Sequence, residues 1–140
     1  MIENALVAFG LERLYAGLRR LTPREGLSLT AASTLKRLVR DGPHRLSDLY
    51  AAEGVTQPAM TQLVTRLERE GLAERGSDAA DGRVVLVSIT DAGRAVVERR
   101  RANYAAALAT VLDELAAEDR AAIVAALPAV ERLCDTLERG

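Results

Sequence analysis

Apolar residues recur with a helical period at both ends of the chain. The intervals are three and four residues, which places the side chains on one face of an α-helix. Near the start this face comprises Leu11, Leu14, Leu18 and Leu21. In the last helix, which we expect to begin near Asp119, it comprises Ile123, Leu127, Val130, Cys134 and Leu137. Pro128 lies within this last segment and should kink or break the helix near Leu127.

Between these two segments, helix start and stop signals follow one another at short intervals. Thr30 can cap a second helix, which the Gly42–Pro43 pair ends. Ser47 can cap a short third helix, which Gly54 stops. The pattern therefore predicts two helices separated by a tight turn in this part of the chain.

A fourth helix follows directly. Thr56 can cap it, and Pro58 lies in its first turn, where a missing backbone N–H is tolerated. Gly71 ends it. The inner face of the third and fourth helices is expected to comprise Leu49, Val55, Met60, Leu63, Val64 and Leu67.

The pattern then changes to that of a β-hairpin. Leu72–Gly76 and Val84–Ile89 are expected to be strands around the turn 77–82, with Val85, Val87 and Ile89 on one face of the second strand. Thr90 opens a long helix over residues 91–118. The arginines at 99–101 are expected on a solvated face of this helix.

The predicted element order indicates a fold class. A capped short helix, a glycine turn, a second capped helix and then a hairpin together make a winged helix-turn-helix, in which the hairpin is the wing. The fold class is therefore mainly α with a small β-hairpin wing. We expect the winged helix-turn-helix domain at residues 30–94, and a helical dimerisation region at residues 1–29 and 95–140.

In a helix-turn-helix the second helix enters the major groove of DNA, and its N-terminal residues reach base edges. Glutamine can pair with adenine through two hydrogen bonds, and threonine can bond a base or touch the thymine methyl group. The expected DNA-binding residues of this recognition helix are Thr56, Gln57, Pro58, Thr61, Gln62, Thr65 and Arg66. The alternative is an ordinary helical hairpin with a solvated face.

The wing carries a second candidate contact. Arg83 lies near the tip of the hairpin, where a guanidinium can enter the narrow minor groove. Asp81, two residues earlier, can orient that side chain or cap the turn. The alternative is a surface turn with a charge pair that contributes little to stability.

The run from Thr56 to Arg94 resembles the MarR family of winged-helix regulators. The family pattern combines R-L-E-x-x-G-L, a following arginine, a D-x-R wing tip and an I/L-T-x-x-G-R helix start. The residues that match are Arg66, Leu67, Glu68, Gly71, Leu72, Arg75, Asp81, Arg83, Ile89, Thr90, Gly93 and Arg94. Gln62, Thr65 and Tyr50 depart from it: arginine, aspartate and a small residue are common at those positions.

The resemblance implies a homodimer that binds a pseudo-palindromic double-stranded DNA operator. It also implies repression that is relieved by a small-molecule effector, often an aromatic acid, or by an oxidant. Family ligands commonly sit between the dimer helices and the winged domain. Residues that can meet a carboxylate there are Arg13, Tyr15, Arg19 and Arg20.

Composition and charge limit the alternatives. The 140 residues carry a net charge of −1, and residues 41–89 hold eight acidic groups against five basic ones. DNA contact must therefore rest on a few placed arginines, and a winged-helix module that binds protein instead of DNA is the alternative function. The only histidine, His44, has no cluster of partners for a metal site, and neither a nucleophile–base pair nor a phosphate loop indicates an enzyme or a cofactor.

No apolar run approaches the ~18 residues of a membrane span, and Glu3 and Glu12 in the first segment do not fit a signal peptide. With a single cysteine, Cys134, the sequence favours a reducing compartment, so we expect a cytoplasmic protein without membrane partners. Cys134 itself is expected in the core or in an interface rather than as a redox sensor.

The apolar stripes at the two ends of the chain have no partner in a compact winged domain. An exposed patch of that size on a monomer indicates an interaction surface. We therefore expect a dimer interface formed by Leu11, Leu14, Leu18, Ile123, Leu127, Val130, Cys134 and Leu137.

Overall fold

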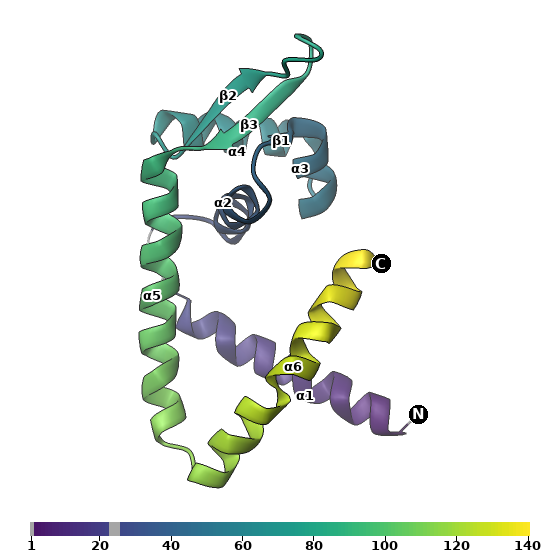
Figure 1. Ribbon diagram of the computed structural model, residues 1–140, viewed down its shortest axis with the longest axis vertical. Helices are drawn as coiled ribbons and strands as arrows, with labels where there is room; N and C mark the ends of the chain where they lie inside the picture. The colour runs from purple at the N-terminus through teal and green to yellow at the C-terminus, as the bar shows by residue number, and fades with distance from the viewer. Residues whose placement is uncertain (1, 23–25) are drawn as a thin grey trace. The chain divides into compact units, whose positions relative to one another are not determined.

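The computed structural model describes residues 2–22 and 26–140 (Figure 1). Over these residues the helices are α1 (Ile2–Leu21), α2 (Leu29–Asp41), α3 (Leu46–Glu53), α4 (Gln57–Arg69), α5 (Asp91–Asp113) and α6 (Ala117–Arg139). The strands are β1 (His44–Arg45), β2 (Ala73–Ser77) and β3 (Val85–Ile89). The mainly helical fold with a small hairpin wing is as predicted.

The chain forms two compact units, and the boundary between them falls within α5, after Asn103. The first unit holds the hydrophobic core. Its fully buried large side chains come from α2, α3, α4 and β3, and are Leu35, Leu38, Leu49, Met60, Val64, Leu67 and Val87. Burying an aliphatic side chain of this kind stabilises the fold by roughly 1.5–3 kcal/mol. The predicted inner face of α3 and α4 is therefore confirmed, with Val55 and Leu63 half-buried at its edge.

The three strands form an antiparallel sheet in the order β1-β3-β2. The hairpin pairs Ala73 with Ile89 and Ser77 with Val85. The two-residue strand β1, which the sequence did not predict, pairs His44 with Val87. The His44 ring nitrogen Nδ1 lies 2.8 Å from the carbonyl oxygen of Gly42, and no cluster of metal-ligating side chains occurs among the described residues.

Two of the predicted helix caps are wrong. Helix α2 begins at Leu29, and its cap is Ser28, whose hydroxyl accepts a hydrogen bond from the backbone N–H of Ala31 at 3.1 Å. Thr30 lies inside the first turn. Helix α3 begins at Leu46 without a side-chain cap, so Ser47 is helical. Two cap-forming residues close to each other in sequence compete, and the tertiary position of the helix decides between them.

The start of α4 is as predicted. Thr56 accepts a hydrogen bond from the backbone N–H of Ala59 at 3.3 Å, and Pro58 occupies the first turn. Before it, Gly54 ends α3 in the left-handed conformation with φ of 65°, which glycine adopts without steric cost. These local signals fix where the recognition helix begins and how the chain enters it.

The base of the wing is joined to α5 by a close backbone contact. The Thr90 hydroxyl donates to the carbonyl oxygen of Gly71 at 2.6 Å and accepts from the backbone N–H of Gly93 at 3.1 Å. A Cβ atom on Gly93 would lie 2.1 Å from the carbonyl oxygen of Leu72. Only glycine fits at this position, so the start of α5 is held against the end of α4.

In the second unit, the end of α5 and the start of α6 differ from the prediction. Helix α5 stops at Asp113 and α6 starts at Ala117, because a short turn after Asp113 interrupts the predicted helix. Arg120 forms an ion pair with Asp113 across that turn at 2.9 Å. Helix α6 is continuous through Pro128, so of the predicted kink or break near Leu127 the break does not occur. About eleven helical residues on each side of the proline retain their hydrogen bonds and outweigh the one that it removes.

Candidate DNA-binding surface

The outward face of α4 is defined by what its opposite face buries. Met60, Val64 and Leu67 point into the core. At about 100° per residue, the positions opposite to them include those of the four exposed residues Pro58, Gln62, Thr65 and Arg69. These four side chains form a stripe along α4, here called the outer stripe. Gln57 and the capping Thr56 are exposed at the start of the helix, and Thr61 is half-buried beside the stripe.

Arg66 lies on one flank of the outer stripe and is engaged within the chain. Its guanidinium donates to Glu70 at 3.1 Å and to the carbonyl oxygen of Gly26 at 3.2 Å. Gly26 precedes α2, so Arg66 links α4 to the segment that leads into α2. A DNA contact by Arg66 stays a prediction, and such a contact must compete with these bonds.

Arg75, on strand β2, engages the other flank. Its guanidinium forms an ion pair with Glu68, and its Nη2 donates to the carbonyl oxygen of Thr61 at 3.1 Å and to the hydroxyl of Thr65 at 3.0 Å. Its backbone N–H donates to the second Glu68 oxygen at 3.3 Å. Arg75 on the wing strand β2 therefore holds α4 beside the outer stripe.

The sequence reasoning missed Arg69. This residue is exposed at the last turn of α4 and lies four residues after Thr65 and seven after Gln62, which is the spacing of one helical face. Extending the helical period beyond Arg66 would have found it. Unlike Arg66 and Arg75, it has no hydrogen bond or ion pair within the described part of the chain.

The wing tip presents Arg83. Its side chain is 93% exposed, and its Nε lies 3.4 Å from the carboxylate of Asp81. The same carboxylate accepts the backbone N–H of Arg83 at 3.0 Å, so Asp81 shapes the turn as well as facing the guanidinium. Closer to the sheet, Arg45 on β1 faces Asp78 at 3.7 Å. Arg83 is therefore the most projecting cation of the hairpin.

Much of the acidic charge in this region is paired locally. Glu68 faces Arg75, Glu70 faces Arg66 and Asp78 faces Arg45. At the end of α2, Arg40 donates to both carboxylate oxygens of Asp41 and thereby lowers the pKa of that carboxyl below its usual value. These pairs leave the net charge of residues 41–89 unchanged but engage several of its acidic groups locally, and the outer stripe itself carries no acidic residue.

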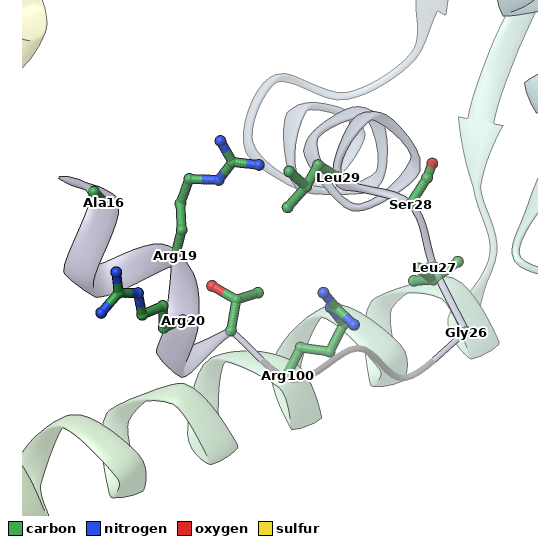
Figure 2. A pocket seen from close by; sticks show the side chains of 9 residues that line it. Ala16, Arg19, Arg20, Gly26, Leu27, Ser28, Leu29 and Arg100 are labelled. Atoms are coloured by element: carbon green, nitrogen blue, oxygen red, sulfur yellow. The ribbon is translucent and has the colours of Figure 1, made fainter.

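A second candidate site lies at the end of α1. An open cavity of about 910 Å³ is lined there by Ala16, Arg19, Arg20, Thr22, Gly26, Leu27, Ser28, Leu29 and Arg100 (Figure 2). Arginines from α1 and from α5 border it together, and its described lining includes no acidic residue. Of the four effector contacts suggested by the resemblance, Arg19 and Arg20 line this cavity; Arg13 and Tyr15 are not among the described lining residues.

Arg100 corrects the expectation for the arginines at 99–101. It is only 6% exposed, and its Nη1 has no hydrogen-bond partner among the described residues. Figure 2 shows its guanidinium directed into the cavity. A buried unpaired cation is costly and creates a position that an anion would stabilise. The sequence carried no signal that singled out the middle arginine of the three.

The predicted interface residues of α1 and α6 are solvent-accessible in the single chain. Leu11 and Leu14 are exposed, as are Ile123, Leu127, Val130, Cys134 and Leu137, while Leu18 is half-buried. Helix α1 also exposes large apolar residues that the prediction omitted, Ile2, Leu6, Val7 and Phe9. Neither α1 nor α6 has a buried residue, and no helix in the described part of the chain is long and apolar enough to cross a membrane.

Comparison with known proteins identifies the family. The model described as "MarR family" matches residues 27–85. An uncharacterized HTH-type transcriptional regulator of Mycobacterium bovis, Mb0904, is 32% identical over 95 residues, which cover 68% of this chain and 66% of the relative. Such relatives are named as transcriptional regulators and not as enzymes.

Solved structures share the fold over almost the whole chain. The transcriptional regulator BldR from Sulfolobus solfataricus is 26% identical, with a TM-score of 0.69 and coverage of 99% of this chain and 96% of its own. BpsR of Bordetella bronchiseptica, whose DNA binding is regulated by 6-hydroxynicotinic acid, is 26% identical with a TM-score of 0.59 and coverage of 91% of each chain. The chain belongs to the MarR family of winged-helix regulators.

Proposed function

We propose that the protein is a sequence-specific double-stranded DNA-binding transcriptional regulator that acts as a homodimer on a pseudo-palindromic operator. The observation that carries the proposal is the outer stripe of α4, which is exposed between two engaged flanks and lies in the same compact unit as the projecting Arg83. The stripe offers an amide, a hydroxyl-bearing side chain and a cation, which suit base edges and phosphates in the major groove. Arg83 suits the adjacent minor groove.

The apolar side chains that α1 and α6 expose support the proposed dimer. A monomer seldom presents apolar patches of this extent to water, and an isologous contact across a two-fold axis would bury them. A two-fold dimer would present two recognition helices to half-sites about one DNA turn apart, ~34 Å, or a multiple of it. The proposal includes a cytoplasmic location, because the regulator must reach DNA.

We further propose repression relieved by a small organic anion that binds in the arginine-lined cavity. The cavity brings Arg19, Arg20 and the buried Arg100 to one space, and an anionic ligand would supply the partner that Arg100 Nη1 lacks among the described residues. Leu27 and Leu29 also line the cavity and suit an aromatic or aliphatic body attached to the acidic group. The regulation of BpsR by 6-hydroxynicotinic acid makes an aromatic acid the first class to test.

The primary test is selection of bound duplexes from a random-sequence library at a fixed salt concentration, because affinity for DNA depends steeply on salt. An enriched inverted repeat supports the proposal, and its spacing gives the distance between half-sites. If no sequence is enriched over the starting library, the alternative of a winged-helix module that binds protein without DNA replaces it.

A further inference from the structure

The side chain of Thr65 is fixed by two hydrogen bonds. Its hydroxyl donates to the carbonyl oxygen of Thr61 at 2.8 Å and accepts from Nη2 of Arg75 at 3.0 Å. We propose that Thr65 reads thymine through its methyl group, and that Arg75 is the positioning residue that holds it in that orientation. This inference rests on the proposed DNA-binding function and adds a specificity-determining contact to it.

The hydroxyl of Thr65 has no proton left for DNA. A threonine hydroxyl has one proton to donate, and here that proton goes to the Thr61 carbonyl. The hydroxyl therefore cannot donate to a base acceptor. One of its two lone pairs is occupied by the Arg75 guanidinium as well. The polar end of the side chain is turned to the helix backbone and to the wing.

The methyl group is the part of Thr65 that suits thymine. Thr65 is exposed and belongs to the outer stripe, and its hydroxyl can only accept, whereas thymine presents an acceptor and a methyl group in the major groove, so the Cγ2 methyl group is the part of the side chain available to thymine. A methyl group on a groove-facing helix is complementary to the C5-methyl of thymine, which no other DNA base carries. The contact is apolar and needs no hydrogen bond from the hydroxyl.

Three of the five N–H donors of Arg75 are engaged within the chain. Its Nη2 has two protons, and these serve the Thr61 carbonyl and the Thr65 hydroxyl, while its Nη1 pairs with Glu68. The bond to the Thr65 hydroxyl makes the arginine a positioning residue for Thr65. Because it comes from β2, it couples the orientation of Thr65 to the wing.

Gln62, three residues before Thr65, provides a contrast within the same stripe. It is exposed and has no hydrogen bond in the described chain, so its amide is available to bond a base edge. The outer stripe thus pairs one hydrogen-bonding reader with one apolar reader, and these two can be separated by experiment.

The test uses the full-length protein and the operator obtained by selection. Each thymine of one half-site, and its symmetry mate, is replaced in turn by deoxyuridine, which removes only the C5-methyl group. For the wild type, one thymine position should show a loss of roughly fourfold per half-site, the size expected when one methyl group leaves an apolar contact. The Thr65→Ser variant keeps the hydroxyl bonds but lacks the methyl, and should bind the thymine and uracil operators equally.

Four further variants complete the design. Thr65→Val keeps a methyl on the groove side and should retain the uracil penalty, whereas Gln62→Ala should retain it while changing preference at a different base. Arg75→Met should reduce the ratio of the affinity for the thymine operator to that for the uracil operator. A variant that only weakens folding would lower both affinities equally and leave this ratio unchanged. Arg75→Lys, which can donate to Thr65, should restore part of that ratio.

The outcomes separate this inference from the function on which it rests. If the selection yields no operator, both fail. If an operator is found but no thymine is sensitive to deoxyuridine, or if Thr65→Ser keeps the full uracil penalty, DNA binding stands and the thymine contact is overturned.

Discussion

The winged part of the molecule and its terminal helices use apolar residues in opposite ways. In α2, α3, α4 and β3 the large apolar side chains are buried among themselves, and the polar stripe faces outward. In α1 and α6 the large apolar side chains are accessible to water, and neither helix buries a residue. The first region completes its hydrophobic core within one chain, whereas the second leaves large apolar side chains accessible, which the proposed dimer would bury. The difference predicts distinct consequences of mutation in the two regions.

The largest expected effect comes from α6. Replacing Val130 and Leu137 together by glutamate places charges on the proposed interface and should dissociate the dimer and abolish operator binding. The wing should retain its structure, because neither residue belongs to the core of the first unit. Sedimentation is the measurement, with the double Val130→Ala, Leu137→Ala variant as a milder control. A wild-type protein that sediments as a 15.0 kDa monomer at micromolar concentration would contradict the dimer.

In the winged region the effect should appear as a loss of folding stability. Leu35 is fully buried, so Leu35→Ala should reduce the free energy of unfolding by about 2–5 kcal/mol. The neighbouring Lys36 is exposed, and Lys36→Ala should change that free energy by no more than about 0.5 kcal/mol. Urea denaturation measures both. Equal effects for the two variants would show that the core does not lie where this structure places it.

The wing tip should contribute to DNA binding and not to stability. Arg83→Ala should weaken operator binding by roughly 1–3 kcal/mol, the range for a good groove contact, while the free energy of unfolding changes by no more than about 0.5 kcal/mol. Fluorescence anisotropy with labelled operator measures the affinity. Arg101→Ala removes the same charge from an exposed position on α5 and serves as the control. Wild-type affinity in Arg83→Ala would remove this residue from the site.

The smallest expected effect concerns the cavity. Arg100→Met removes a buried guanidinium with an unpaired nitrogen, so the ligand-free protein should become more stable by about 1 kcal/mol. The same change should weaken binding of 6-hydroxynicotinate, used as a probe anion, when measured by calorimetry. Arg101→Met, one residue along α5, should do neither. A loss of stability in Arg100→Met would indicate that the side chain stabilises the fold and would contradict its proposed role in ligand binding.

Local signals made much of the fold predictable. Thr56, Pro58 and Gly54 act on the turn that contains them, so the start of α4 and the end of α3 follow from a few adjacent residues. Strand β1 could not be predicted in this way. It consists of two residues and exists because His44 and Arg45 pair with β3, more than forty positions along the chain. Its sequence has no strand pattern of its own.

The candidate site likewise contains residues that local sequence signals predict and contacts that depend on distant parts of the chain. Gln62, Thr65 and Arg83 were found because helical period and hairpin geometry place them on the surface. The bond from Arg75 to Thr65 spans ten residues across the start of the wing, and that from Arg66 to Gly26 spans forty. Neither has a sequence signal. Arg100 was missed for a similar reason, because it lines a cavity together with residues at the end of α1, and its arginine neighbours give no sign of this.

The close contact at Gly93 has a consequence for how such regulators diverge after gene duplication. Any side chain there would collide with the Leu72 carbonyl, so a substitution at this position would disturb the junction between the wing and α5. The outer stripe of α4 supports no core packing, and a copy can exchange Gln62 or Arg69 while keeping its fold. On the proposed function, descendants of one ancestral chain can therefore acquire new target sequences through the stripe, while the close contact at the junction requires a glycine there.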